Sequence, residues 1–469
     1  MKNLLSFFCL ILLPGVLPAQ DISGDWHGLL EIQGLKLRLV FHLTQDGDTL
    51  HATLDSPDQG AFGMPVREAT FGGNQLSIQM PDLFLQYTGT PNADFTEMTG
   101  TFRQGAVQAP LSLSRKAPEK PVVRRPQTPE KPYPYREEEV RFSNPRAQIQ
   151  LAGTLTIPQG EGPFPVVVLI SGSGPQDRNE SLMGHQPFLI IADYLTRKGI
   201  AVLRFDDRGV GASEGDFSTA TSADFATDVL AAVHYLKSRK DIRADQIGLA
   251  GHSEGGLIAP IVAAKSPDVR FIVLLAAPGV KSRDLMLKQL ELISRAQGES
   301  EEGIKEDLRV MGQAYDMVVQ STDPEKLKTE LEAFFDLEWR KLSEADRQRM
   351  GGDKDTFLKQ TIRTLTSPWF IYFLKFDPAE YLSHVKCPVL AVNGAKDLQV
   401  DAQQNLSGIR NALLAGKNAH FTVKEFPELN HLFQHCDTGA PTEYAQIEET
   451  FSEEVLQYIS DWILDTLRE

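Results

Sequence analysis

The sequence predicts an α/β chain, in which a doubly wound, mostly parallel sheet with a helical insertion follows a small all-β domain. From residue 201 onward, strand-like and helix-like segments alternate with short connections, which is typical of a parallel doubly wound sheet. Residues 20–115 instead carry short runs of alternating polarity, such as residues 35–43 and 76–80, separated by turn signals. Alternation of this kind indicates strands with one buried face. We therefore expect an antiparallel barrel or sandwich over residues 20–115, followed by the α/β domain over residues 136–469.

The N-terminal segment has the features of an export signal. Lys2 is followed by an apolar stretch from Leu4 to Leu13, and Ala19 supplies a small residue at the end. Such a stretch is too short to cross a bilayer and is typical of a cleaved signal peptide. We expect residues 1–19 to be removed and the mature protein to be periplasmic or secreted.

Residues 116–135 are rich in proline and charge and contain no glycine. This composition favours an extended, semi-rigid backbone. The segment is therefore predicted to be a linker that holds the two domains apart.

The pentapeptide Gly251-His-Ser-Glu-Gly255 is the most informative motif of the chain. An apolar, strand-like run precedes it, and residues 256–265 favour a buried helix. A serine on a tight turn between strand and helix needs small residues on both sides, and its hydroxyl is presented above the sheet in the G-x-S-x-G nucleophile elbow. Ser253 is therefore the candidate nucleophile.

A serine nucleophile needs a base and an acid that orients the base, and after this elbow the acid precedes the histidine in the chain. Asp397 follows the strand-like residues 388–394, whereas the rival Asp401 opens a helical stretch and is expected to cap it. His431 lies in the loop after the next strand, where the base is required. Its alternatives are His384, His420 and, as the fallback, His435.

The oxyanion hole requires two backbone N–H groups aimed at the developing negative charge. One is expected from Glu254, the residue after the nucleophile. The other is expected from the loop after the strand-like residues 165–170, where Ser173 is the first choice and Gly172 the second. The acidic and basic residues 206–208 lie beside a turn and are expected to form ion pairs that brace the fold.

Three motifs together resemble the esterase D-like bacterial carboxylesterases and the serine aminopeptidase-like branch of the α/β-hydrolases. These are Ser171-Gly-Ser-Gly-Pro-Gln-Asp-Arg-Asn179, Arg204-Phe-Asp-Asp-Arg-Gly-Val-Gly-Ala-Ser213 and Gly251-His-Ser-Glu-Gly-Gly256. The resemblance covers roughly residues 136–469 and implies an eight-stranded sheet and carboxylic ester hydrolysis. Many relatives have His-Gly where this chain has Ser171-Gly172, a difference that concerns how the loop is braced.

More than a hundred residues of helical character separate the strand-like residues 271–275 from Pro388. A sheet connection of this length predicts a cap, placed at about residues 281–385. Trp369 and the aromatic residues after it either wall an acyl pocket or pack the cap on the core. A cap excludes bulky folded substrates and favours small ones.

Composition narrows the function further. A net charge of −16 argues against partners such as nucleic acid or an anionic membrane surface. The sequence contains no H-E-x-x-H pattern and no paired cysteines, so no metal and no cofactor is expected. Cys387 and Cys436 are expected at opposite ends of a strand, roughly 20 Å apart, and therefore as free thiols rather than the ~4.4–6.8 Å pair of a disulfide.

These observations predict a Ser-His-Asp hydrolase that acts on a small-molecule carboxylic ester. An aminopeptidase, an oligopeptidase-like enzyme and a thioesterase use the same groups and remain alternatives. An oligopeptidase usually carries a far longer N-terminal propeller. A protein of another class, a binding protein with an inactive hydrolase core, also remains open.

Overall fold

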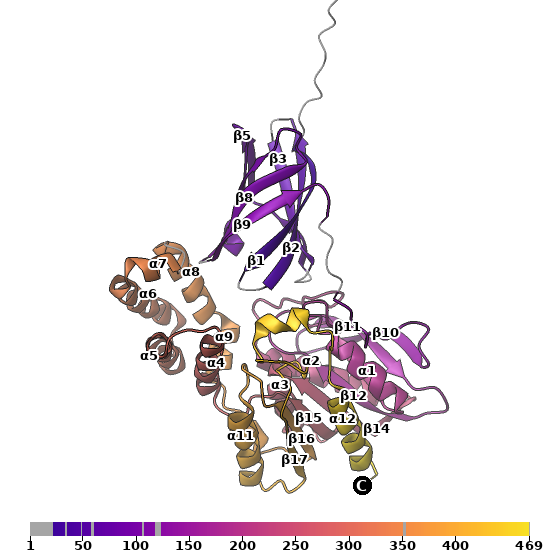
Figure 1. Cartoon of the computed structure of the whole chain (residues 1–469). Coiled ribbons are helices and arrows are strands. Elements are labelled where there is room, and N and C mark those ends of the chain that lie inside the picture. The colour runs from indigo at the N-terminus through magenta and orange to yellow at the C-terminus, as the bar shows by residue number, and fades with distance from the viewer. Residues whose placement is uncertain are drawn as a thin grey trace, which may run out of the picture.

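The computed structural model describes residues 22–468 except residues 33–34, 48, 58–60, 106, 118–122 and 350–352. The expected export signal, residues 1–19, lies outside the described residues, as does part of the expected linker. Two sheets and a separate group of helices make up the described part of the chain (Figure 1).

The N-terminal domain is a single antiparallel sheet that is curled. In the described residues it has nine strands in the order β4-β3-β2-β1-β9-β8-β7-β6-β5. Its strands are β1 (Gly24–Ile32), β2 (Leu35–Asp46), β3 (Thr49–Ser56), β4 (Ala61–Pro65), β5 (Glu68–Gly72), β6 (Gln75–Met80), β7 (Leu85–Pro91), β8 (Glu97–Gln104) and β9 (Val107–Ser114). The curl brings β3 and β5 into contact although they lie near opposite ends of the strand order.

Alternating side chains of these strands form the core of the N-terminal domain. Trp26 is fully buried there and its indole N–H donates to the carbonyl oxygen of Ile22 over 2.8 Å. The predicted all-β domain is therefore present.

The second sheet is mostly parallel, as in a doubly wound fold. In the described residues it has eight strands in the order β10-β11-β13-β12-β14-β15-β16-β17, and the pairs β10–β11 and β11–β13 are antiparallel while the others are parallel. Its strands are β10 (Arg136–Asn144), β11 (Ile149–Ile157), β12 (Phe164–Ile170), β13 (Ala201–Phe205), β14 (Ile242–His252), β15 (Val269–Leu275), β16 (Val389–Gly394) and β17 (Phe421–Phe426).

Helices cover both faces of this sheet. On β12, Val166, Val168 and Ile170 face one core, while Val167 and Leu169 face the other, as the two-residue period of a strand requires. The first core includes side chains of α2 (Ser222–Lys237), α3 (Glu254–Ala263) and α11 (Ala402–Ala415), and the second those of α1 (Pro187–Arg197) and α12 (Glu453–Thr466).

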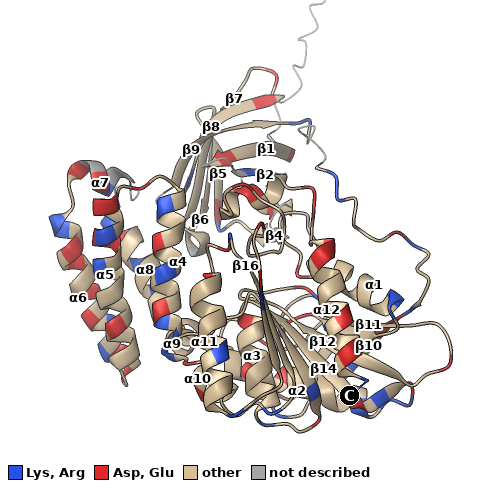
Figure 2. Cartoon of the chain, turned by 60° about the horizontal axis from the view of Figure 1, so that its bottom comes forward, with Lys and Arg blue, Asp and Glu red and all other residues tan. Residues whose placement is uncertain are grey.

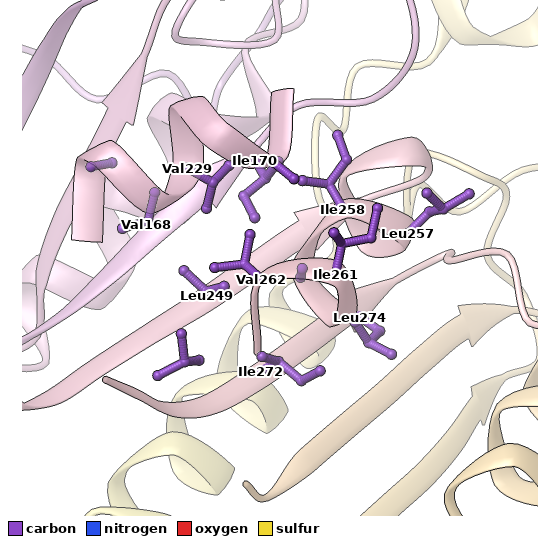
Figure 3. Packing of buried hydrophobic residues seen from close by; sticks show 14 of the residues in the cluster. Val168, Ile170, Val229, Leu249, Leu257, Ile258, Ile261, Val262, Ile272 and Leu274 are labelled. Carbon is purple, nitrogen blue, oxygen red and sulfur yellow. The ribbon is translucent and has the colours of Figure 1, made fainter. Parts of the chain in front are cut away.

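Helix α3 packs closely against the sheet. Figure 3 shows Leu257, Ile258, Ile261 and Val262 of this helix beside Leu249 and other side chains of the strands below it. These side chains are buried, so the packing fixes the position of the turn that leads into α3.

A helical insertion lies between β15 and β16, where the sequence predicts a cap. Its helices are α4 (Ser282–Ala296), α5 (Glu301–Gln320), α6 (Pro324–Lys341), α7 (Glu344–Arg349), α8 (Lys354–Leu365), α9 (Pro368–Lys375) and α10 (Ala379–Leu382). Side chains of α4, α5, α6, α8 and α9 share an apolar core of their own, and charged residues lie along α4, α5, α6 and α8 (Figure 2).

The described part of the linker is bound to the α/β domain. Arg125 donates to the carbonyl oxygens of Met183, Ala445 and Ile447, at 3.0, 3.0 and 2.6 Å. The turn between β8 and β9 also meets the helical insertion, because a side chain at Gly105 would lie 2.7 Å from Oε1 of Gln360. The expectation that the two domains are held apart is therefore wrong, because hydrogen bonds and packing hold the linker and this turn on the second domain.

Across residues 22–468, apart from the gaps given above, no helix is both long and apolar enough to cross a membrane. Cys387, two residues before β16, and Cys436, beyond the far end of that strand, are free thiols.

Candidate functional site

Ser253 lies on a sharp turn between β14 and α3. Its backbone has φ 52° and ψ −117°, a conformation that non-glycine residues adopt only under constraint. A Cβ at Gly251 would lie 2.0 Å from the carbonyl oxygen of Gly255, and one at Gly255 would lie 2.1 Å from that of Ile170. The two glycines are therefore required by the close approach of backbones at this turn, as the G-x-S-x-G pattern predicts.

Asp397 and His431 meet across the carboxyl ends of the last two strands. Asp397 follows β16 and His431 follows β17, and His431 Nδ1 lies 2.7 Å from Asp397 Oδ2. Both side chains are buried. The other carboxylate oxygen of Asp397 accepts from the N–H groups of Gln399 and Val400, each at 2.8 Å. The carboxylate is thus fixed by the backbone before it orients the imidazole.

The rival residues have other partners. Asp401 accepts from the N–H of Gln404 and caps α11, as predicted. His435 is largely exposed and pairs with Glu449 over 2.8 Å. His384 is exposed and bonds to the carbonyl oxygen of Glu380, and His420 precedes β17. Among the four candidate histidines, His431 is the one joined to Asp397.

His252 connects the serine turn to the histidine loop. Its Nε2 lies 3.0 Å from the carbonyl oxygen of His431, and the centroids of the two imidazole rings are 4.8 Å apart. Because His252 directly precedes Ser253, this bond ties the nucleophile candidate to the loop that carries the base candidate.

Glu180 holds His252 from the other side. Its Oε1 lies 3.0 Å from His252 Nδ1, so both ring nitrogens of His252 face oxygen acceptors. A histidine donates to two acceptors at once only when each ring nitrogen carries a proton, so this arrangement favours the imidazolium form of His252. Burial lowers the pKa of His252, but the charge of Glu180 and the hydrogen bonds raise it, and the net pKa lies above its usual value.

The same carboxylate oxygen binds the loop after β12. The N–H of Gly172 donates to Glu180 Oε1 over 2.7 Å. Gly172 also lies beside the nucleophile candidate, since a side chain there would come within 3.4 Å of the Ser253 Cβ. The N–H of Gly172 is therefore occupied within the protein, and the amides of Ser173 and Glu254 remain as the oxyanion candidates.

The side chain of Glu254 points away into the protein. Its carboxylate accepts from Ser222 Oγ at 2.5 Å and from Trp369 Nε1 at 2.9 Å, and burial raises its pKa. Trp369 belongs to α9, so this bond joins the helical insertion to the residue after Ser253.

Ser171 is braced by Asp207. Ser171 Oγ donates to Asp207 Oδ1 over 2.8 Å, and the N–H of Gln176 donates to its other oxygen over 2.9 Å. Burial raises the pKa of Asp207 to about 8, and the nearby Glu254 and Glu180 raise it too. The serine thus keeps a hydrogen bond that supports the loop.

Two of the three neighbouring charged residues, Asp206 and Arg208, form ion pairs as predicted, whereas Asp207 accepts hydrogen bonds from Ser171 and Gln176 instead. Asp206 pairs with Arg178 over 2.8 Å and Arg208 pairs with Asp228 over 2.7 Å. Three features of the site were not predicted from the sequence. These are the contact of Glu180 with His252, the contact of His252 with the His431 loop, and the hydrogen bond from Ser171 to Asp207. His252 lies inside the elbow motif, but nothing in the sequence indicates that a carboxylate from residue 180 would reach it.

Parts of this chain are similar in sequence to known proteins. The family model described as serine aminopeptidase, S33 matches residues 186–333. Esterase EstD of Thermotoga maritima is 27% identical over 315 residues, which cover 67% of this chain and 65% of EstD. The Bacillus subtilis protein YtaP is 32% identical over 133 residues, which cover 25% of this chain and 44% of YtaP.

These two alignments therefore span less than two thirds of the length of each relative. Among solved structures, the Pyrococcus furiosus esterase Pf2001 has a TM-score of 0.42 and 15% identity, covering 71% of this chain and 93% of that one. The residues matched by the family model run from the start of α1 through the Ser253 turn and into the helical insertion. The doubly wound sheet, the serine turn and these sequence matches together support an esterase-like α/β-hydrolase superfamily for this chain.

Proposed function

We propose that this protein is a serine hydrolase that cleaves small carboxylic esters through an acyl-enzyme. The observation that carries the proposal is the buried hydrogen bond of 2.7 Å between His431 Nδ1 and Asp397 Oδ2. Held in this way, the neutral imidazole has its proton on Nδ1 and a lone pair on Nε2, which is the tautomer that a general base needs.

The reaction would proceed in two steps. His431 takes the proton of Ser253 Oγ as the oxygen attacks the ester carbonyl, and Asp397 stabilises the imidazolium that forms. The tetrahedral oxyanion is bound by the amides of Glu254 and Ser173. The alcohol leaves with the proton from His431, and water then cleaves the acyl-serine by the same route.

The helical insertion would act as a cap that selects small substrates. Support comes from the bond of 2.9 Å between Trp369 Nε1 and Glu254, which anchors α9 beside the elbow. In this role the aromatic residues of α9 both pack the cap and limit the space beside Ser253.

Peptide hydrolysis is the second candidate, favoured by the description of the matched family as serine aminopeptidase. A panel of short p-nitrophenyl esters and aminoacyl anilides separates the two activities. We expect a higher kcat/KM for the esters, and faster turnover of the anilides would replace esterase by peptidase as the proposed function. A thioester in the same panel tests the thioesterase alternative.

A fluorophosphonate probe distinguishes an enzyme from a binding protein with an inactive hydrolase core. We expect labelling of the wild-type chain, no labelling of Ser253→Ala, and full labelling of Ser238→Ala, a control at an exposed serine of the same domain. An unlabelled but folded wild-type chain would support the binding protein.

We also propose that the protein is exported after removal of residues 1–19. The support is the sequence pattern of that segment alone. N-terminal sequencing of the protein from its native host tests this, and a mature chain that begins at Met1 would contradict it.

A further inference from the structure

A large cavity lies between the helical insertion and the N-terminal sheet. Its volume is about 910 Å³, and helices α4, α5, α6 and α8 contribute most of its wall. Its apolar lining includes Met286, Leu290, Val310, Met311, Phe335 and Phe357. This volume lies in the range of about 300–1,000 Å³ that is usual for small-molecule sites.

The N-terminal domain completes the wall. Gln104 and Val107, on either side of the turn between β8 and β9, also line the cavity. The lining residues thus come from two segments far apart in the sequence, the N-terminal sheet and the helical insertion, which are neighbouring parts of the chain in Figure 1. The N-terminal sheet therefore forms part of the wall of this cavity.

The cavity is distinct from the reacting groups but adjoins the helix that contacts them. None of its described lining residues is Ser253, Asp397 or His431. Phe370 of α9 lines it, while the preceding residue, Trp369, bonds to Glu254. Helix α9 thus contributes one residue to the cavity wall and one contact to the elbow.

The charged residues of the wall disfavour an anionic ligand. Four carboxylates line the cavity, namely Glu306, Asp307, Glu338 and Asp346, against one cation, Lys341. Arg309, just outside, pairs with Glu306 and Glu338, both at 2.6 Å. Along the described wall an anionic headgroup would therefore meet more carboxylates than cations, whereas an uncharged apolar group would meet mainly hydrocarbon.

We propose that this cavity is a binding site for an uncharged, largely apolar ligand, and that Val107 and Gln104 of the N-terminal sheet form part of the site. Its use during turnover rests on the proposed function: the ligand is then the apolar acyl or alcohol part of an ester that reaches past α9. Binding itself does not depend on catalysis.

The test uses the full-length Ser253→Ala chain, in which a bound ester is not consumed. The neutral fluorophore N-phenyl-1-naphthylamine is titrated, and methyl laurate and laurate are used as competitors. We expect saturable binding, displacement by methyl laurate, and at least tenfold weaker displacement by laurate. Equal competition by the anion, or no saturable binding, would overturn the proposal.

Substitutions locate the site. Val310→Trp on α5 and Val107→Trp on β9 each fill part of the cavity and are expected to weaken binding of the fluorophore at least tenfold. Lys305→Trp and Gln108→Trp place the same side chain at exposed positions of the same elements. The affinity of these two variants for the fluorophore is expected to stay within twofold of the parent chain. Unchanged affinity in both filling variants would overturn the assignment.

Asp307→Lys tests the charge argument at a partly exposed position, where folding is least at risk. It is expected to strengthen displacement by laurate at least fivefold, and no change would remove the role given to this carboxylate.

The proposed function and this binding site can fail separately. A wild-type chain that binds the fluorophore but cleaves no ester would refute the proposed function and leave this site intact. A chain that cleaves short esters but does not bind the fluorophore would refute this site alone.

Discussion

His252 donates a hydrogen bond from Nε2 to the carbonyl oxygen of His431, over 3.0 Å, while its Nδ1 faces Glu180. Glu180 in turn accepts from the N–H of Gly172. One buried ion pair therefore links the loop after β12, the residue before Ser253 and the loop that carries His431. Groups at a reaction centre must hold their geometry to within fractions of an ångström, so we regard this pair as positioning the proposed machinery.

Glu180→Gln removes the charge that stabilises the His252 imidazolium but keeps an oxygen for Gly172. We expect kcat for a short p-nitrophenyl ester to fall by about ten- to a hundredfold because the loops shift. KM is expected within twofold of wild type. The exposed Glu161→Gln serves as the control and is expected to behave as wild type.

The same pair of Glu180 and His252 predicts that the folded protein becomes less stable at alkaline pH. Because the pKa of His252 is raised on folding, its contribution to stability is complete below the ordinary pKa of about 6.5 and is lost as pH rises through the raised pKa. Thermal unfolding from pH 6 to pH 10 should show this loss in wild type and a smaller one in Glu180→Gln. Identical pH profiles of the two proteins would contradict the ion pair.

Asp397→Asn is expected to lower kcat by about 10⁴-fold, because the amide disturbs the tautomer of His431. The fold should persist, since Asn Oδ1 can still accept from the N–H groups of Gln399 and Val400. Asp401→Asn is the matched control: Asn also caps helices well, so stability and kcat should both stay near wild type. Comparable activity of the two variants would rule out the role proposed for Asp397.

Gly255→Ala is expected to destabilise the domain by about 3 kcal/mol or more, because its Cβ would lie 2.1 Å from the backbone oxygen of Ile170. Gly72→Ala meets no atom within 4 Å and should change the free energy of unfolding by less than about 0.5 kcal/mol. Denaturant titration of the two variants measures the difference. A Gly255→Ala protein as stable as wild type would show that the turn is looser than described.

Asp207→Asn tests the buried acid behind Ser171. The pKa of Asp207 is raised to about 8, so the folded state holds its proton more tightly than the unfolded state, and stability falls as pH rises from about 4 to 8. The amide keeps an acceptor for Ser171 and does not ionise. We expect Tm to drop less between pH 5 and pH 9 in the variant than in wild type, with exposed Asp216→Asn following wild type.

Much of the proposed site could be predicted from the sequence because its signals are local. The glycines around Ser253 reflect the sterics of one turn, and the strands before Asp397 and His431 appear as short apolar runs. The cap of α11 by Asp401 is likewise encoded within a few residues. The strand ends alone indicate the order Ser253, Asp397, His431, which is also the order that the resemblance implies.

The sequence by itself determined the two sheets, the elbow and the order serine, aspartate, histidine, since each depends on neighbours along the chain. Only the tertiary structure decided that Glu180 reaches His252, that the Gly172 N–H is occupied, and that the β8–β9 turn meets the helical insertion. The bonds from His252 to Glu180 and to His431 join residues 72 and 179 positions apart. Contacts over such separations are set by how whole elements pack, and no local pattern of polarity or propensity records them.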